Sequence, residues 1–318
     1  MMQILLLLGT LIALYIAWSI GANDETMANL AGSKFVSITT AIVLGAIMDF
    51  LGAVILGYKV EETISKDLLN YRITEVDALI IVISVALWLT IASSYGWPIS
   101  TTHSVIGACI GLSIVKSGME AINWYILAKI ILAWLLSPLI GLLCTVVIIK
   151  FLSNLINRYA KGLVARVRVT YLAAYLLLIW SCISAFSRGA NDIANATAFL
   201  SVVYGNSLVM RIICGLGMSL GLVTIGKRVV KSVGFSLSNL DPFTALTVQI
   251  SVALTMLIGT LAKLPLSGTH ILVGSIVGVG VAKGTWLNIG NIKRIILFWI
   301  LTFPVTLVLA GLLSIGFS

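Results

Sequence analysis

Charged residues are scarce in this chain. Asp, Glu, Lys and Arg together make up 10% of its 318 residues, whereas hydrophobic residues make up 60%. The mean hydropathy is +1.13. This composition excludes a soluble globular domain, in which about 25% of the residues are charged. Apolar runs of about 20 residues, the length that crosses a bilayer as a helix, recur along the chain. The sequence therefore predicts an all-α polytopic membrane protein.

Cysteine and histidine are also rare, which narrows the possible functions. The four cysteines stand singly in apolar runs, without the spacing of a metal site. The sequence shows no nucleophile paired with a base and no nucleotide-binding loop, so we expect neither an enzyme nor a cofactor. The net charge is +9. The basic residues cluster in a few loops, a pattern that is typical of membrane topology and not of a nucleic-acid surface.

Two polar motifs are each present twice. Residues 21–24 (Gly-Ala-Asn-Asp) recur as residues 189–192, and residues 98–103 (Pro-Ile-Ser-Thr-Thr-His) recur as residues 265–270 (Pro-Leu-Ser-Gly-Thr-His). The offsets are 168 and 167 residues, and the glycines after the second motif keep the same offset. The chain is therefore interpreted as two copies of one unit, with a polar site where the copies meet.

These offsets divide the chain into a first transmembrane repeat (1–150), a basic cytoplasmic loop (151–168) and a second transmembrane repeat (169–318). Each half offers five apolar stretches, at residues 2–20, 36–56, 78–94, 99–115 and 122–149, and at residues 169–186, 207–225, 243–261, 266–281 and 295–315.

The basic residues predict which side of the membrane each loop faces. With one crossing per apolar stretch, the loop at 150–168 lies on the same side as the loops around Lys227 and Lys283, and this side is cytoplasmic by the positive-inside rule. Both termini are then outside the plasma membrane. An odd number of crossings per half turns the second repeat upside down, which is the inverted-repeat plan of secondary transporters.

Straight spans would place the two copies of each motif on opposite faces of the membrane, where one site could not use both. Pro98 and Pro265 interrupt helical hydrogen bonding. We therefore expect residues 78–115 and 243–281 to form broken helices or re-entrant hairpins whose tips meet near the midplane. Short helical segments are expected after both Gly-Ala-Asn-Asp copies.

Acidic side chains at the first motif suggest a cation site. Asp24 and Asp192 each follow an asparagine, Asn23 or Asn191, and carboxylate and amide oxygens are hard ligands suited to Na⁺. Protons would also fit, and simple helix capping is the structural alternative.

Glu25 and Asp49 also lie in or beside membrane segments, where an ionisable group is a functional candidate. Both are possible extra coupling residues, and Asp49 could instead pair with a base.

The second motif places hydroxyl groups at the start of a helix, where free backbone N–H groups and the helix dipole attract anions. Capping by one hydroxyl at each tip is again the alternative. The candidate anion ligands are Ser100, Thr101, Thr102, Ser267, Gly268 and Thr269. His103 and His270 are expected to hydrogen bond to the turn, with a proton relay as the other possibility.

In these motifs the sequence resembles the PiT family of inorganic phosphate transporters, which are Na⁺- or H⁺-coupled. The resemblance implies a phosphate site at the repeat interface, bridging Na⁺ ions, surrounding membrane lipid and a homodimer. Carried over by position, the cation and anion site would include Asn23, Asp24, Asn191, Asp192 and Asn195.

The two halves differ at three of these positions. Met27 stands where the second half has Asn195, Glu25 stands where it has Ile193, and Gly268 replaces the threonine of the first tip. Arg188 precedes the second Gly-Ala-Asn-Asp and is expected to attract anions from outside or to anchor at the membrane interface.

The resulting prediction is Na⁺-coupled import of inorganic phosphate. Proton-coupled uptake of phosphate or sulfate on the same scaffold is the alternative, and an anion channel is a third reading.

Overall fold

The computed structural model describes residues 2–198, 207–236, 241–284 and 287–316, and within these ranges the chain is helical with no β-strand. The helices of the first half are α1 (Met2–Ala22), α2 (Ala28–Gly32), α3 (Ile38–Leu56), α4 (Tyr58–Glu62), α5 (Glu75–Ser94), α6 (Thr101–Ser117) and α7 (Trp124–Tyr159). Those of the second half are α8 (Leu163–Asp192), α10 (Ser207–Gly221), α11 (Lys227–Ser236), α12 (Pro242–Leu261), α13 (Gly268–Lys283) and α14 (Ile289–Gly316).

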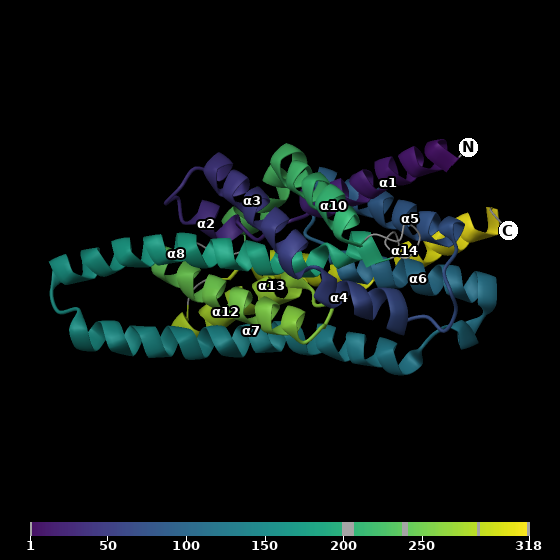
Figure 1. Ribbon diagram of the computed structural model, residues 1–318. Coiled ribbons are helices and arrows are strands. Elements are labelled where there is room, and N and C mark those ends of the chain that lie inside the picture. Colours follow the sequence, from purple (N-terminus) through teal and green to yellow (C-terminus); the bar gives the residue numbers. More distant parts are fainter. Residues whose placement is uncertain (1, 199–206, 237–240, 285–286, 317–318) are drawn as a thin grey trace.

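The two halves repeat the same elements in opposite directions. Both chain termini lie at one end of the molecule, and the connection between α7 and α8 lies at the other end (Figure 1). Helix α1 therefore begins at the end of the molecule that carries the termini, whereas its counterpart α8 begins at the opposite end. The predicted inverted repeat is confirmed.

The composition of the helices makes this a multi-pass membrane protein. Among the described residues, seven helical stretches are long and apolar enough to cross a membrane, and part of α1 (Thr10–Ala22) and all of α13 are shorter apolar helices. Helix α7 leaves large apolar side chains such as Leu135 and Leu139 more than half exposed. These side chains can face lipid, where exposure of leucine costs nothing.

Two helical hairpins occupy the predicted positions. Helices α5 and α6 form the first hairpin, and α12 and α13 form the second. In each hairpin the backbone reverses direction at a residue with left-handed conformation. This residue is Gly96 (φ +69°) in the first hairpin and Lys263 (φ +61°) at the matching position of the second. Glycine adopts this conformation without a steric penalty, whereas lysine does not.

An ion pair closes the base of each hairpin. Lys116 Nζ at the end of α6 lies 2.7 Å from Asp77 Oδ2 at the start of α5. In the second hairpin, Lys283 Nζ lies 3.3 Å from Asp241 Oδ2, the residue that caps α12. Both pairs join the outer ends of the two helices, so each hairpin is held closed at its base while its tip points into the molecule.

The two halves are interlocked because most helix–helix contacts join a helix of the first half to a helix of the second. Helix α6 packs on α14, α7 packs on α13, α1 packs on α10 and α3 packs on α8. The glycines that follow the hairpin tips allow this contact. A Cβ atom on Gly274 would lie 2.1 Å from the Pro138 backbone oxygen, and one on Gly111 would lie 2.0 Å from the Leu307 oxygen.

The basic loop predicted at residues 151–168 is mostly helical. Helix α7 continues to Tyr159 and α8 already begins at Leu163. Lys and Arg are good helix formers, and Gly162, with φ +87°, is the one strong helix breaker in this stretch. Lys227 likewise lies on a helix, at the start of α11, and not in a loop. Clustered basic residues indicate the membrane side, but they do not mark the end of a helix.

Candidate functional site

The tips of the two hairpins meet and hydrogen bond to each other. The Thr102 hydroxyl donates to the Leu266 backbone oxygen at 3.1 Å, and the Thr269 hydroxyl donates to the Ile99 backbone oxygen at 3.2 Å. Both contacts are buried and related by the internal repeat. The six predicted anion ligands therefore lie in one region at the starts of α6 and α13, where backbone N–H groups are available.

One serine caps the helix at each tip. Ser100 Oγ accepts a hydrogen bond from the His103 N–H, and Ser267 Oγ accepts one from the His270 N–H. The capping alternative is thus true of these two serines. Their hydroxyls remain able to donate to an anion, because a hydroxyl carries one donor in addition to its acceptor lone pairs.

Asn23 ties the first Gly-Ala-Asn-Asp motif to the first tip. Its amide nitrogen donates to Ser93 Oγ at 3.1 Å and to the Trp97 backbone oxygen at 2.9 Å. Its Oδ1 accepts from the Ile99 N–H at 3.2 Å. Both amide donors are therefore engaged, and Oδ1 keeps one free lone pair for a ligand.

Asn191 makes the same three contacts in the second half. It donates to Thr260 Oγ1 at 3.1 Å and to the Leu264 oxygen at 3.0 Å, and it accepts from the Leu266 N–H at 3.2 Å. Each asparagine thus positions the tip of its own hairpin. The Gly-Ala-Asn-Asp motif predicts the asparagines only as ligands or caps, and nothing in the sequence pattern indicates this bracing role.

A buried guanidinium joins the acidic residues of both motifs. Arg188 donates to both Glu25 carboxylate oxygens, at 2.5 and 3.1 Å, and to Asp192 Oδ2 at 2.8 Å. Its Nη1 also lies 3.9 Å from Asp24 Oδ1. Arg188 is only 3% exposed. The expectation that it anchors at the membrane interface is therefore wrong, because its three carboxylate neighbours solvate the charge in the interior.

Asp49 joins the same cluster from α3. It is fully buried and interacts with Asp24, Arg188 and Asp192. Its backbone packs against Gly189, where a Cβ atom would lie 2.2 Å from the Asp49 oxygen. In the described part of the chain, no hydrogen-bond donor reaches either Asp49 carboxylate oxygen. Asp49 therefore belongs to the acidic cluster around Arg188.

Buried polar atoms of Asp192 and Asn195 are also left without a hydrogen-bond partner in the described part of the chain. Among the residues that the structure describes, Asp192 Oδ1 and both polar atoms of the Asn195 side chain have no hydrogen-bond partner, although both residues are buried. Buried polar atoms without partners are costly, and their presence here is typical of a ligand site. Hard oxygen donors of this kind suit a monovalent cation.

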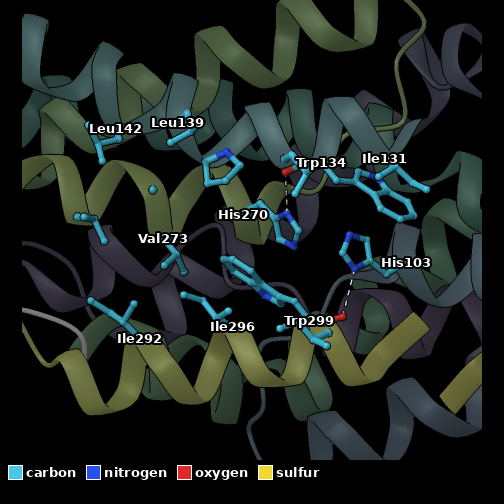
Figure 2. Close-up of a pocket in the computed structure, with 15 residues that line it drawn as sticks. His103, Ile131, Trp134, Leu139, Leu142, His270, Val273, Ile292, Ile296 and Trp299 are labelled. Carbon is cyan, nitrogen blue, oxygen red and sulfur yellow. Dashed lines mark hydrogen bonds between the residues drawn. The ribbon is translucent and has the colours of Figure 1, made fainter. Parts of the chain in front are cut away.

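The two histidines connect the tips to the long helices. A carbonyl oxygen can only accept, so His103 Nδ1 donates to the Trp299 oxygen at 3.3 Å and His270 Nδ1 donates to the Trp134 oxygen at 3.2 Å. Their ring centroids are 4.7 Å apart, and Figure 2 shows the two rings side by side. The rings thus have hydrogen-bond partners, as predicted, but these partners lie on α14 and α7 and not in the turns.

A cavity of about 440 Å³ lies beside the two histidines, between α7, α13 and α14 (Figure 2). Apart from the histidines and tryptophans, its lining is aliphatic, with residues such as Leu139 and Val273. An apolar cavity cannot replace the hydration of an inorganic anion. This cavity is therefore unsuited to an inorganic anion.

Known proteins place the chain in one family. Residues 20–310 match the sequence model of the Phosphate transporter family. A protein from Pyrococcus furiosus named "Putative phosphate permease PF1020" is 29% identical, over 97% of this chain and 95% of its own length. A similarly named protein from Chlamydia pneumoniae is 28% identical, over 95% of each chain.

A solved structure described as "The sodium-dependent phosphate transporter" superimposes with a TM-score of 0.90. It is 26% identical and covers 98% of both chains. Because the family match spans far more than half of the sequence, the chain belongs to the phosphate transporter family, and it is a multi-pass phosphate transporter and not an enzyme.

Proposed function

We propose that the protein imports phosphate together with Na⁺, with the anion at the hairpin tips and the cations among the acidic residues. The observation that carries this proposal is the charge balance of the buried cluster. Asp24, Glu25, Asp49 and Asp192 surround a single guanidinium, that of Arg188. With all four carboxylates ionised the cluster is negatively charged, and a phosphate anion would add further negative charge to it. Cations must therefore accompany the anion in this poorly solvated region.

The tips supply the anion ligands of the proposed site. The hydroxyls and backbone N–H groups at the starts of α6 and α13 would bind phosphate oxygens. The acidic residues and Asn195 would bind Na⁺, with the remaining lone pairs of Asn23 and Asn191 available at the boundary. The solved structure with the same fold is described as sodium-dependent, which supports Na⁺ as the coupling ion.

Uptake of labelled phosphate into proteoliposomes tests this proposal. An inward Na⁺ gradient is expected to drive saturable uptake, and Asp192→Asn is expected to abolish it. Uptake that follows a proton gradient instead would assign proton coupling. Flux that never saturates and needs no coupling ion would indicate an anion channel.

Sulfate as a competitor tests the substrate. Protonated phosphate can donate a hydrogen bond to the Asp24 or Asp192 carboxylate, whereas sulfate carries no proton at neutral pH. Excess sulfate is therefore expected to leave phosphate uptake unchanged. Equal displacement by sulfate would contradict phosphate specificity and favour the sulfate alternative.

We further propose that both termini lie outside the plasma membrane and that the protein is a homodimer in surrounding lipid. The termini lie at the end opposite the basic α7–α8 connection, as the positive-inside rule requires (Figure 1). A cysteine introduced near the C-terminus, in a background without the four native cysteines, should react with a membrane-impermeant reagent in intact cells. Protection from this reagent would reverse the orientation, and a monomeric mass in native mass spectrometry would refute the dimer.

A further inference from the structure

Three positions that break the internal repeat meet in space. The first-half counterpart of Arg188 is Ile20, the second-half counterpart of Glu25 is Ile193, and Gly268 corresponds to Thr101 of the first tip. Arg188 and Glu25 are 163 residues apart in sequence but form a bidentate ion pair.

Gly268 completes this group because the guanidinium occupies the space that a side chain would need. A Cβ atom on Gly268 would lie 2.8 Å from Cδ, Nε and Nη1 of Arg188. Glu25 in addition interacts with the Thr269 side chain. The positive charge of Arg188 therefore lies between the acidic residues on one side and the start of α13, the proposed anion site, on the other.

The equivalent positions in the other half carry no charge. Ile20 and Ile193 are both buried, at 2% and 0% exposure, and both belong to the same apolar cluster. The scaffold therefore folds with an aliphatic pair at this place. An ion pair is not required for packing, and a buried ion pair is weak evidence for stability.

We propose that Arg188 is a tethered cation that takes the place of one transported Na⁺ between the acidic residues and the second tip. The guanidinium touches carboxylates of both repeats and the anion-binding tip, as a bridging Na⁺ would. Unlike Na⁺, it does not leave with phosphate. The protein then transports one Na⁺ fewer per phosphate than its four carboxylates would otherwise demand. This inference rests on the proposed Na⁺ coupling and adds its stoichiometry.

The ratio of Na⁺ to phosphate, measured with both isotopes in the same proteoliposomes, tests the inference. Arg188→Gln removes the fixed charge, so the ratio is expected to rise by about one Na⁺ per phosphate, since a buried charge must be balanced. Glu25→Gln removes one negative charge and should lower the ratio by a similar amount. The double variant restores the net charge and should return to the wild-type ratio.

Arg211→Gln is the matched control. Arg211 is also a buried arginine in an ion pair, with Glu61 at 3.2 Å, and neither residue contacts the acidic cluster in any described interaction. Its replacement should leave the ratio unchanged. An unchanged ratio in both Arg188→Gln and Glu25→Gln would overturn the inference. If Arg188→Gln does not fold, the fall in the ratio for Glu25→Gln decides alone.

The proposed function and this inference fail in different ways. If phosphate uptake by the wild-type protein does not depend on Na⁺, the proposed coupling ion is wrong, whatever the variants show. The ratio is then measured for protons with a pH-sensitive dye inside the vesicles, and the same opposite shifts are expected for Arg188→Gln and Glu25→Gln. Na⁺-driven uptake whose ratio does not respond to either variant supports the function and refutes the tethered cation.

Discussion

Replacement of Asn191 by alanine should loosen the second hairpin tip without changing the acidic cluster directly. The variant loses three hydrogen bonds, to Thr260, Leu264 and Leu266. Side-chain hydrogen bonds within membrane proteins contribute about 0.6 kcal/mol each, so the total loss is about 2 kcal/mol. This would lower the melting temperature of the detergent-solubilised protein by roughly 4 °C.

Asn195 is the matched control for this experiment. It is the same residue type, four positions further along the chain, equally buried, and its amide has no partner among the described residues. Asn195→Ala should therefore leave the melting temperature unchanged in the absence of Na⁺ and should reduce the stabilisation that added Na⁺ provides. Asn191→Ala should show the opposite pattern, a lower melting temperature with Na⁺ stabilisation partly retained.

The internal repeat sharpens this prediction. Asn23→Ala removes the three equivalent hydrogen bonds of the first hairpin, so its melting temperature should fall by the same amount as that of Asn191→Ala. If both alanine variants melt like the wild type and lose only the stabilisation by Na⁺, the asparagine side chains act mainly as cation ligands and contribute little to the stability of the hairpin tips. That result would refute the reasoning from the hydrogen bonds.

Two further predictions concern packing and pH. Gly274→Ala places a methyl group against the Pro138 oxygen, so α7 and α13 must separate, and overpacking of this kind should cost about 1–3 kcal/mol in thermal unfolding. An unchanged melting temperature would show that α7 can shift to accommodate the added methyl group at little cost. At the base of the second hairpin, burial raises the pKa of Asp241, but hydrogen bonds from Thr244 and the nearby Lys283 outweigh it and lower this pKa below its ordinary value of 3.8. A lowered pKa in the folded state stabilises the protein above that value, and the stabilisation is lost as the pH falls through the folded pKa. Asp241→Asn should therefore flatten the acid dependence of the melting temperature, and an unaltered pH profile would contradict this.

The sequence predicts the hairpins because each carries its own local signal. Pro98 and Pro265 interrupt two apolar stretches at matching positions, and the chain reverses two residues before each proline, at Gly96 and Lys263. The meeting of the tips was also predictable, since straight spans would have separated the two copies of each motif. Local chain chemistry and the constant offset were sufficient for this part of the fold.

The partners of Arg188 and Asn191 were not predictable in the same way. Each depends on contacts between helices that are distant in sequence, and periodicity alone does not specify which residues face each other. A signal for Arg188 does exist: Arg188 and Glu25 are opposite charges that both lack a counterpart in the other repeat. Opposite charges that appear unmatched in an otherwise repeated membrane sequence are candidates for a buried pair.

The crossed packing of the halves also determines the order in which the protein can be assembled during synthesis. Helix α7 is complete at Tyr159, but α13, against which it packs, ends at Lys283. The ribosome adds residues at about 5–20 per second, so α7 waits several seconds in the bilayer for its partner. During this interval the surface around Pro138 lacks the helix that covers it in the complete protein. Biogenesis of the first half is therefore completed only by the second, and a chain cut between α7 and α8 should accumulate in the membrane only when both fragments are produced together.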